Sequence, residues 1–137
     1  MKIFDFGLAA ELNELTPLSS GAYNLKGGIG TCRFMAPEIA LFQPYNLKAD
    51  VYSFSMVMYN LLSLKKPYEG LNMKEWFDFA VTKDGRPSIS EIEDTHTNEN
   101  INKLMQHCWD PCLTIRPSFD AIECILQNES CMWHEIE

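Results

Sequence analysis

The chain has 137 residues, 46% of them hydrophobic and 12% aromatic, which is typical of one globular domain and excludes a disordered segment. Eleven lysines and arginines against 19 aspartates and glutamates give a net charge of −8, which repels nucleic-acid phosphates and anionic lipid headgroups. No apolar run approaches the roughly 20 residues of a membrane span, and no signal-peptide pattern begins the chain. We therefore expect neither nucleic acid nor membrane as a partner, and a location in the cytoplasm or nucleus.

The first predicted feature is an extended start followed by a long loop. Within LTPLSSGAYNLKGGIGT, one proline and four glycines stand among small polar residues, and such residues interrupt regular structure. Loops of this length are usually functional or mobile. The first forty or so residues are therefore predicted to be an extended start followed by a functional or mobile loop.

Four helices are predicted after the loop. The run KADVYSFSMVMYNLLSL (48–64) contains no Gly or Pro and is apolar on nearly all sides, which predicts a central helix buried all round. Three amphipathic segments follow, with apolar residues at helical spacing over 73–81, 101–109 and 119–126, and Ser118 is the expected N-cap of the last. The sequence thus predicts an all-α bundle around one buried central helix.

The cysteines lack the spacing of a disulfide framework, so we expect reduced structural thiols. They are Cys32, Cys108, Cys112, Cys124 and Cys131. The stretch HCWDPC brings His107 close to two of them and suggests zinc, but no second Cys or His pair lies at finger-like spacing. We therefore favour thiols over a metal site.

Several motifs occur in a fixed order along the chain. They are DFG (5–7), GTCRFMAPE (30–38), KADVYSFSMV (48–57), KKPYEG (65–70), GRPSI (85–89) and CWDPCLTIRPSF (108–119). Over about residues 2–126 the sequence resembles the C-terminal half of a eukaryotic protein kinase domain. The residues within its motifs resemble those of the tyrosine-kinase-like branch of Ser/Thr kinases. The resemblance implies a mainly α, kinase-like C-lobe fragment over 1–128. Its activation segment would be 5–38, its helical C-lobe 39–128, and 129–137 a tail.

The resemblance also implies roles for individual residues. Asp5 would bind the Mg²⁺ that bridges the phosphates of ATP, Phe6 would pack under a helix of the upper lobe, and Gly7 would let the backbone turn. Thr31 would bond to the catalytic loop of a Ser/Thr kinase, and Asp50 would accept backbone hydrogen bonds from that loop.

Two further features follow from the resemblance. Glu38, at the end of Ala36-Pro37-Glu38, would form a buried ion pair with Arg116. A phosphate on one of its hydroxyls could order the activation segment by pairing with an arginine. The arginine that usually fills this role in the family is not in this chain. The candidate phosphosites are Thr16, Ser19, Ser20 and Tyr23.

The resemblance implies ATP-dependent transfer of phosphate to Ser/Thr hydroxyls of protein substrates. The chain lacks the Gly-rich loop, the strand lysine and the His-Arg-Asp loop of the family, so we expect it to be inactive alone and part of a longer kinase. The alternative is a catalytically dead kinase lobe that binds substrates or kinase partners through the helices from Met73 onward. Met73 and Trp76 lie on a helix that kinases often use to dock substrates.

Overall fold

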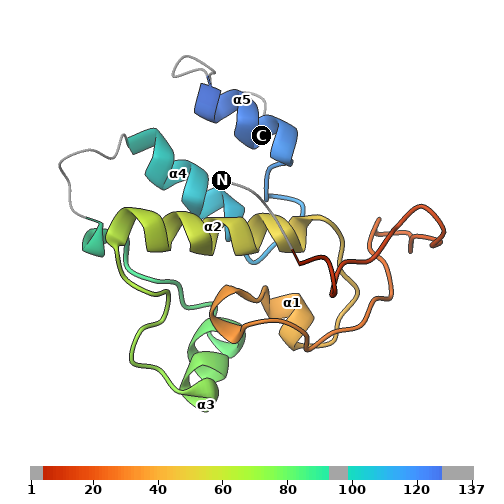
Figure 1. Ribbon diagram of the computed structural model, residues 1–137, viewed down its shortest axis with the longest axis horizontal. Coiled ribbons are helices and arrows are strands. Elements are labelled where there is room, and N and C mark those ends of the chain that lie inside the picture. Colours follow the sequence, from red (N-terminus) through yellow and green to blue (C-terminus); the bar gives the residue numbers. More distant parts are fainter. Residues whose placement is uncertain (1–4, 93–98, 128–137) are drawn as a thin grey trace.

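Helix α2 (Lys48–Ser63) lies at the centre of the computed structural model, which describes residues 5–92 and 99–127 (Figure 1). No Gly or Pro interrupts this stretch, and Asn46 Oδ1 accepts a hydrogen bond from the Lys48 backbone N–H at 3.0 Å. The helix ends where Leu64 adopts a left-handed φ of 56°. The predicted central helix is therefore confirmed, within one residue of its expected end.

The expectation that this helix is buried on every side is wrong toward its C-terminal end. Leu61 is 64% exposed, and Phe54 and Leu62 are only partly buried against the core. Helix α2 packs on α4 and on η1, and among the described residues nothing covers Leu61. The helix is thus buried on the side that these neighbours cover.

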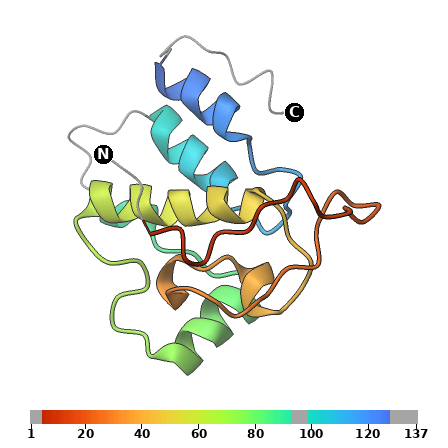
Figure 2. The ribbon, with the colours of Figure 1, turned by 45° about the vertical axis from the view of Figure 1, so that its right-hand side comes forward.

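The other elements flank α2 on two sides. Figures 1 and 2 show α4 and α5 together on one side of α2, with α1 and α3 on the other. Their bounds are Cys32–Phe34 (η1), Pro37–Ala40 (α1), Met73–Trp76 (α3), Phe77–Thr82 (η2), Ile89–Glu91 (η3), Glu99–Cys108 (α4) and Phe119–Gln127 (α5). The described residues form no strand, so the mainly helical class is confirmed.

Local capping explains where the later helices begin. Asn72 Oδ1 accepts hydrogen bonds from the backbone N–H groups of Lys74 and Glu75, and the Glu75 carboxylate accepts one from Asn72 in return. Ser118 Oγ accepts a bond from the Ala121 backbone N–H at 3.2 Å, as predicted for the N-cap of α5. Both helices start where their sequences offer a side-chain acceptor.

The core joins α2 to α4 and to two tryptophans. Leu104 and Met105 are fully buried, and burial of each such side chain contributes about 1.5–3 kcal/mol. Trp76 and Trp109 are only 4% and 6% exposed, whereas Phe77 is 39% exposed. The tryptophans are therefore core residues.

None of the helices in the described part of the chain is long and apolar enough to cross a bilayer.

The long loop crosses beside α2 before it projects away from the helices (Figure 2). Between residues 5 and 31 it has no helix, but η1 and α1 both fall within the forty or so residues predicted as a loop, so that prediction is wrong at its end. Tyr23 and Tyr45 form an isolated antiparallel bridge. Gly28 has a left-handed φ of 67°, which favours glycine, and its N–H donates to Ile39 O at 2.8 Å. The loop thus returns to the helices at two points, the bridge and the Gly28 contact.

Candidate functional site

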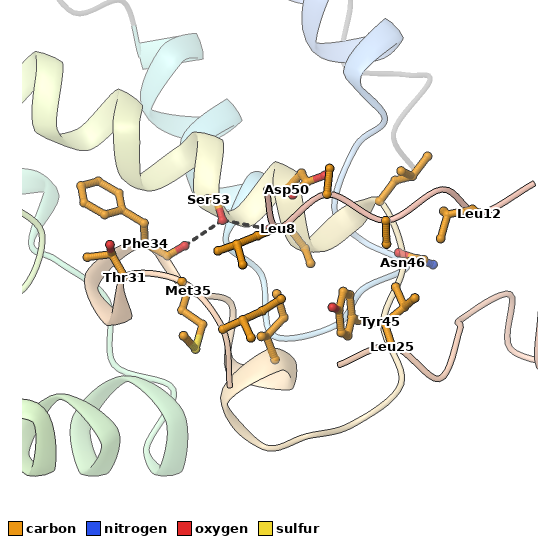
Figure 3. Close-up of a pocket in the computed structure, with 17 residues that line it drawn as sticks. Leu8, Leu12, Leu25, Thr31, Phe34, Met35, Tyr45, Asn46, Asp50 and Ser53 are labelled. Carbon is orange, nitrogen blue, oxygen red and sulfur yellow. Dashed lines mark hydrogen bonds between the residues drawn. The ribbon is translucent and has the colours of Figure 1, made fainter. Parts of the chain in front are cut away.

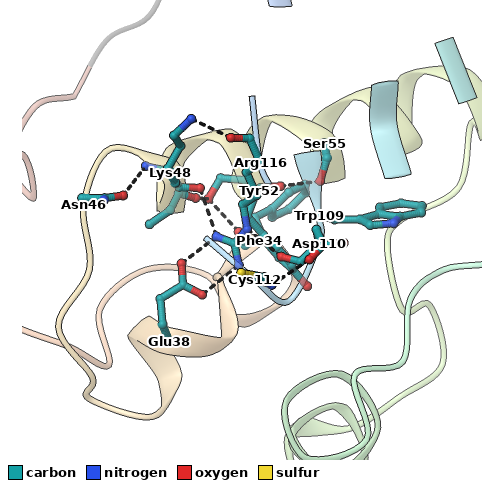
Figure 4. Close-up of polar contacts among 12 residues, drawn as sticks. Phe34, Glu38, Asn46, Lys48, Tyr52, Ser55, Trp109, Asp110, Cys112 and Arg116 are labelled. Atoms are coloured by element: carbon teal, nitrogen blue, oxygen red, sulfur yellow. Dashed lines mark hydrogen bonds and ion pairs between the residues drawn. The ribbon is translucent and has the colours of Figure 1, made fainter. Parts of the chain in front are cut away.

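A buried ion pair joins α1 to the segment before α5 (Figure 4). Arg116 Nη1 and Nη2 donate to Glu38 Oε1 and Oε2 at 2.7 and 3.0 Å, a bidentate geometry. Arg116 is 1% exposed and Glu38 6%. The structure therefore brings together two residues that lie 78 positions apart in the sequence.

The Arg116 guanidinium also contacts α2. Its Nε donates to Asp110 O at 2.7 Å and its Nη1 to Lys48 O at 3.0 Å, while Lys48 Nζ donates back to Arg116 O at 2.6 Å. Burial lowers the pKa of Lys48, and the nearby Arg116 charge lowers it further. The Tyr52 ring lies 5.2 Å from the guanidinium carbons of both Arg116 and Arg86. One arginine thus connects three separate segments.

A cavity of about 320 Å³ lies beside the N-terminal part of α2 (Figure 3). The start of the long loop, the segment 29–35 and α2 form its walls, and Thr31 and Asp50 line it. Ser53 Oγ donates to Phe34 O at 2.8 Å across one wall. The cavity therefore sits where the activation segment, as predicted from the sequence, meets the central helix.

Two predicted functional residues face this cavity without partners. Among the described residues, neither the Asp50 carboxylate nor the Thr31 hydroxyl has a hydrogen-bond partner. Desolvation by the surrounding atoms raises the pKa of Asp50. Both residues are exposed, so their oxygens are accessible to a segment that supplies N–H or C=O groups.

Asp5, Phe6 and Gly7 lie apart from that cavity at the start of the described chain. Asp5 is exposed with a φ of 66°, and its Oδ1 accepts a bond from the Gly7 backbone N–H at 3.3 Å. Phe6 is 69% exposed. The described residues contain no group of three or more His, Cys, Asp or Glu side chains that could hold a metal. The exposed Asp5 carboxylate offers the oxygen donors that Mg²⁺ prefers.

The predicted phosphosites differ in accessibility. Thr16, Ser19 and Ser20 are exposed, whereas Tyr23 is half-buried and takes part in the bridge to Tyr45. The first three hydroxyls are therefore accessible to modification, and Ser20 also lines a pocket with Pro37 and Glu38 of α1.

The cysteines also differ from one another. Cys32, Cys108 and Cys112 carry free thiols, and Cys131 lies outside the described residues, as does the predicted tail 129–137. Burial raises the pKa of Cys108 to about 12. A hydrogen bond with Thr114 lowers the pKa of the exposed Cys112. The two thiols of HCWDPC therefore have opposite environments.

Two arginines with many backbone contacts were not singled out in the sequence. Arg33 donates to Pro67 O and Leu71 O at 2.9 and 3.5 Å, and also to Tyr68 O. Arg86 donates to the main-chain oxygens of residues 80, 85 and 109. The available signal was a lone cation within each of the motifs GTCRFMAPE and GRPSI.

Comparison with known proteins identifies the family. Residues 1–126 match the family described as protein tyrosine and serine/threonine kinase. The chain is 33% identical over 127 residues to the probable serine/threonine-protein kinase gdt4 of Dictyostelium discoideum, covering 93% of this chain and 7% of that protein. It is 35% identical over 123 residues to the dual specificity protein kinase shkC of the same organism, covering 89% and 23%.

A plant protein is similar to the same degree. The serine/threonine-protein kinase STY17 of Arabidopsis thaliana is 33% identical over 122 residues, covering 89% of this chain and 20% of that protein. The chain spans less than a quarter of the length of each of these three relatives. The fold, the order of motifs and these matches together place the chain in the protein tyrosine and serine/threonine kinase family.

Proposed function

We propose that this chain is the C-terminal part of the kinase domain of a protein kinase that transfers the γ-phosphate of ATP to Ser or Thr hydroxyls of protein substrates. The observation that carries the proposal is the cavity beside α2. Thr31 and Asp50, which the family assigns to contacts with the catalytic loop, both line it and have no partner among the described residues. A catalytic loop from a preceding part of a kinase would supply the missing hydrogen bonds.

The residues of this chain have distinct tasks in that reaction. Asp5 would hold magnesium, and that ion would supply neutralisation of phosphate charge during transfer. Thr31 and Asp50 orient the catalytic loop from two sides of the cavity, and the Glu38–Arg116 pair keeps the end of the activation segment on the helical lobe. Because phosphoryl transfer depends on positioning and electrostatics, small displacements of these groups reduce the rate.

The 137 residues alone do not carry out the reaction in this proposal. The general base, the lysine that contacts the phosphates and the Gly-rich loop of the family have no counterpart in the sequence. We therefore infer that activity requires a kinase upper lobe and a catalytic loop that this chain does not supply.

The exposed hydroxyls of the loop are the proposed regulatory sites. A phosphate on Thr16, Ser19 or Ser20 meets no steric barrier because all three are exposed. Phosphorylation of Tyr23 acts differently, since its backbone is held in the bridge to Tyr45. In both cases the added charge would order the loop by pairing with an arginine.

A binding module is the second candidate function. Met73 is 71% exposed and Phe77 39%, so the α3 region presents apolar surface although Trp76 is buried. In this alternative the lobe holds substrates or other kinases through α3 and the later helices and transfers no phosphate. The two functions differ in their dependence on Asp5.

Phosphate transfer by the natural protein that contains this chain tests the proposal. An antibody raised to EIEDTHTNEN (91–100) captures it, and a size well above 15.7 kDa is expected for a complete kinase. We expect transfer from ATP to Ser/Thr peptides, its loss in Asp5→Asn, and wild-type rates in Asp84→Asn. Asp84 is a matched control because it is also an exposed aspartate with a positive φ. Transfer that survives Asp5→Asn would contradict the proposal, and absence of transfer by the wild type would favour the binding module.

A further inference from the structure

The C-terminal end of α1 is fixed on the lobe. Arg116 holds the Glu38 carboxylate in the buried ion pair described above. The Gln43 backbone N–H donates to Glu38 O at 2.9 Å, and the N–H of Phe42 donates to the carbonyl of Ile39 at 3.2 Å. Phe42 adopts a left-handed φ of 56° to close this last turn of the helix. The main chain of Ile39 and Phe42 therefore has little freedom to move.

Two hydrogen bonds attach residues 26–28 of the long loop to this part of the lobe. The Gly28 backbone N–H donates to Ile39 O at 2.8 Å, and the Tyr45 hydroxyl donates to Lys26 O at 2.9 Å. Both bonds use main-chain atoms of the loop, so they depend on no loop side chain and on no modification of one. Tyr45 also lines the cavity beside α2, as Thr31 does (Figure 3).

Gly27, between these two bonds, packs its main chain directly on the end of α1. The residue is buried. A Cβ at Gly27 would lie 2.9 Å from both Ile39 O and Phe42 Cα. These are backbone atoms, so no side-chain rotation could move them away, and the interior around them is closely packed. The close approach of the loop to α1 therefore requires glycine at position 27.

The attachment ends just before Thr31. Residues 29–31 follow it directly and line the cavity beside α2, so a displacement at Gly27 would move Thr31 as well. The stretch NLKGGIG (24–30) contains no Ser, Thr or Tyr, so no hydroxyl there can carry a phosphate. All four candidate phosphosites precede the attachment.

We propose that Gly27 is a positioning residue for Thr31. By letting residues 26–28 pack on the end of α1, it keeps Thr31 at the cavity beside α2 whether or not the loop carries a phosphate. The proposal rests on the proposed kinase function, in which Thr31 contacts the catalytic loop. It adds that packing against α1 orders the stretch before Thr31 and that phosphorylation is not required for this order.

Gly27→Ala and Gly21→Ala form a matched pair, because each adds one methyl group to a glycine of the same loop. Ordinary contact begins at 3.4 Å, so the methyl group at position 27 must displace the loop from α1 by about 0.5 Å or more. A Cβ at Gly21 meets nothing within 4 Å. Gly21 has a φ of 73°, so backbone strain alone would affect the control and not Gly27→Ala.

The test uses the natural protein that contains this chain, with amide hydrogen exchange read by mass spectrometry. Exchange over 26–31 should rise about tenfold in Gly27→Ala, which corresponds to the loss of one hydrogen bond, and should not rise in Gly21→Ala. Tyr45→Phe removes one attachment without adding volume, so it should raise exchange over 26–31 by a smaller factor. It keeps the test decisive if Gly27→Ala does not fold.

A further variant removes every candidate phosphosite before the attachment. It combines Thr16→Ala, Ser19→Ala, Ser20→Ala and Tyr23→Phe. Exchange over 26–31 should equal that of the wild type, because none of these side chains forms the attachment.

Steady-state kinetics supply the second readout. A misplacement of about 1 Å can cost roughly a hundredfold in rate, so kcat should fall roughly 10–100-fold in Gly27→Ala. The KM for ATP should change by less than about twofold, because the attachment does not involve Asp5. Gly21→Ala should keep kcat within about twofold of the wild type.

Unchanged exchange over 26–31 in both Gly27→Ala and Tyr45→Phe would overturn the proposal. Raised exchange in the phosphosite variant would do the same, as would an equal loss of kcat in Gly21→Ala and Gly27→Ala. A wild-type protein without phosphate transfer would overturn the proposed function and with it the catalytic-loop contact of Thr31. The exchange experiment needs no catalysis, so it still shows whether Gly27 attaches the loop to α1, and the two failures are distinguishable.

Discussion

Replacing Arg116 with alanine should destabilise the lobe far more than replacing Lys83. Arg116 is 1% exposed and binds the Glu38 carboxylate through two hydrogen bonds, at 2.7 and 3.0 Å. Its removal leaves a carboxylate that is only 6% exposed without its cation. By contrast, Lys83 and its partner Asp78 form an ion pair with both side chains more than half exposed.

The difference in magnitude follows from burial. Breaking a buried ion pair by removing one partner costs about 3–5 kcal/mol. An exposed pair such as Lys83–Asp78 contributes no more than about 1 kcal/mol. With an unfolding entropy of about 2.1 cal/mol/K per residue over 137 residues, the larger loss lowers the Tm by roughly 10–17 °C. The Lys83→Ala variant should stay within about 3 °C of the wild type.

Thermal unfolding followed by far-UV circular dichroism measures both variants. The double variant Glu38→Gln/Arg116→Met provides a second readout if Arg116→Ala does not fold at all. Because it leaves no unpaired buried charge, it should be more stable than Arg116→Ala alone. Equal Tm values for Arg116→Ala and Lys83→Ala would refute the reasoning, and so would a double variant no more stable than the single one.

Three further outcomes follow from other sites. Because the pKa of Asp50 is raised in the folded chain, the ionised form of its carboxyl opposes folding. The contribution of Asp50 to the free energy of unfolding is therefore fully present below a pH of about 4 and is lost as pH rises through the folded pKa. Asp50→Asn should raise the Tm of the chain at pH 7 but not at pH 3. Tyr68→Phe removes the 2.9 Å partner of the fully buried Tyr52 hydroxyl and should cost about 1–3 kcal/mol in urea unfolding, a loss that a matching Tyr52→Phe change should partly reverse. Iodoacetamide at pH 7.5 should label Cys112 well before Cys108, as peptide mass spectrometry would show, and the reverse order would contradict the assigned environments.

The helices were predictable because local signals define them. The absence of Gly and Pro over 48–63 and the helical spacing of apolar residues later in the chain predicted α2, α4 and α5 closely. The widening of α3 into the π-helical turn η2 was not predictable. Just after this turn, the Gly85 N–H donates to Phe79 O at 2.7 Å, and a Cβ at Gly85 would lie 2.6 Å from the Phe79 ring. Such a contact has no periodic signature.

The candidate site was predictable only in part. The Glu38–Arg116 pair followed from the order of motifs, because no local pattern connects residues 78 positions apart. The contacts of Arg33 and Arg86 could not be predicted, since main-chain carbonyls are acceptors at every residue and the sequence does not identify which will be used. The burial on all sides expected for α2 was wrong at Leu61, because periodicity reports apolarity and not which neighbour covers it.

The Tyr23–Tyr45 bridge divides the segment 5–38 into two tethered arms. Tyr23 and Tyr45 exchange both backbone hydrogen bonds, at 2.8 and 3.1 Å, so the chain returns to the lobe midway between Asp5 and Glu38. Two short closures leave each arm far fewer conformations than one long closure would. A phosphate on the first arm would therefore reorganise the stretch that carries Asp5, while the second arm could keep Thr31 in place. Under the proposed function, the metal ligand Asp5 and the catalytic-loop contact Thr31 would then be under separate control within one continuous segment.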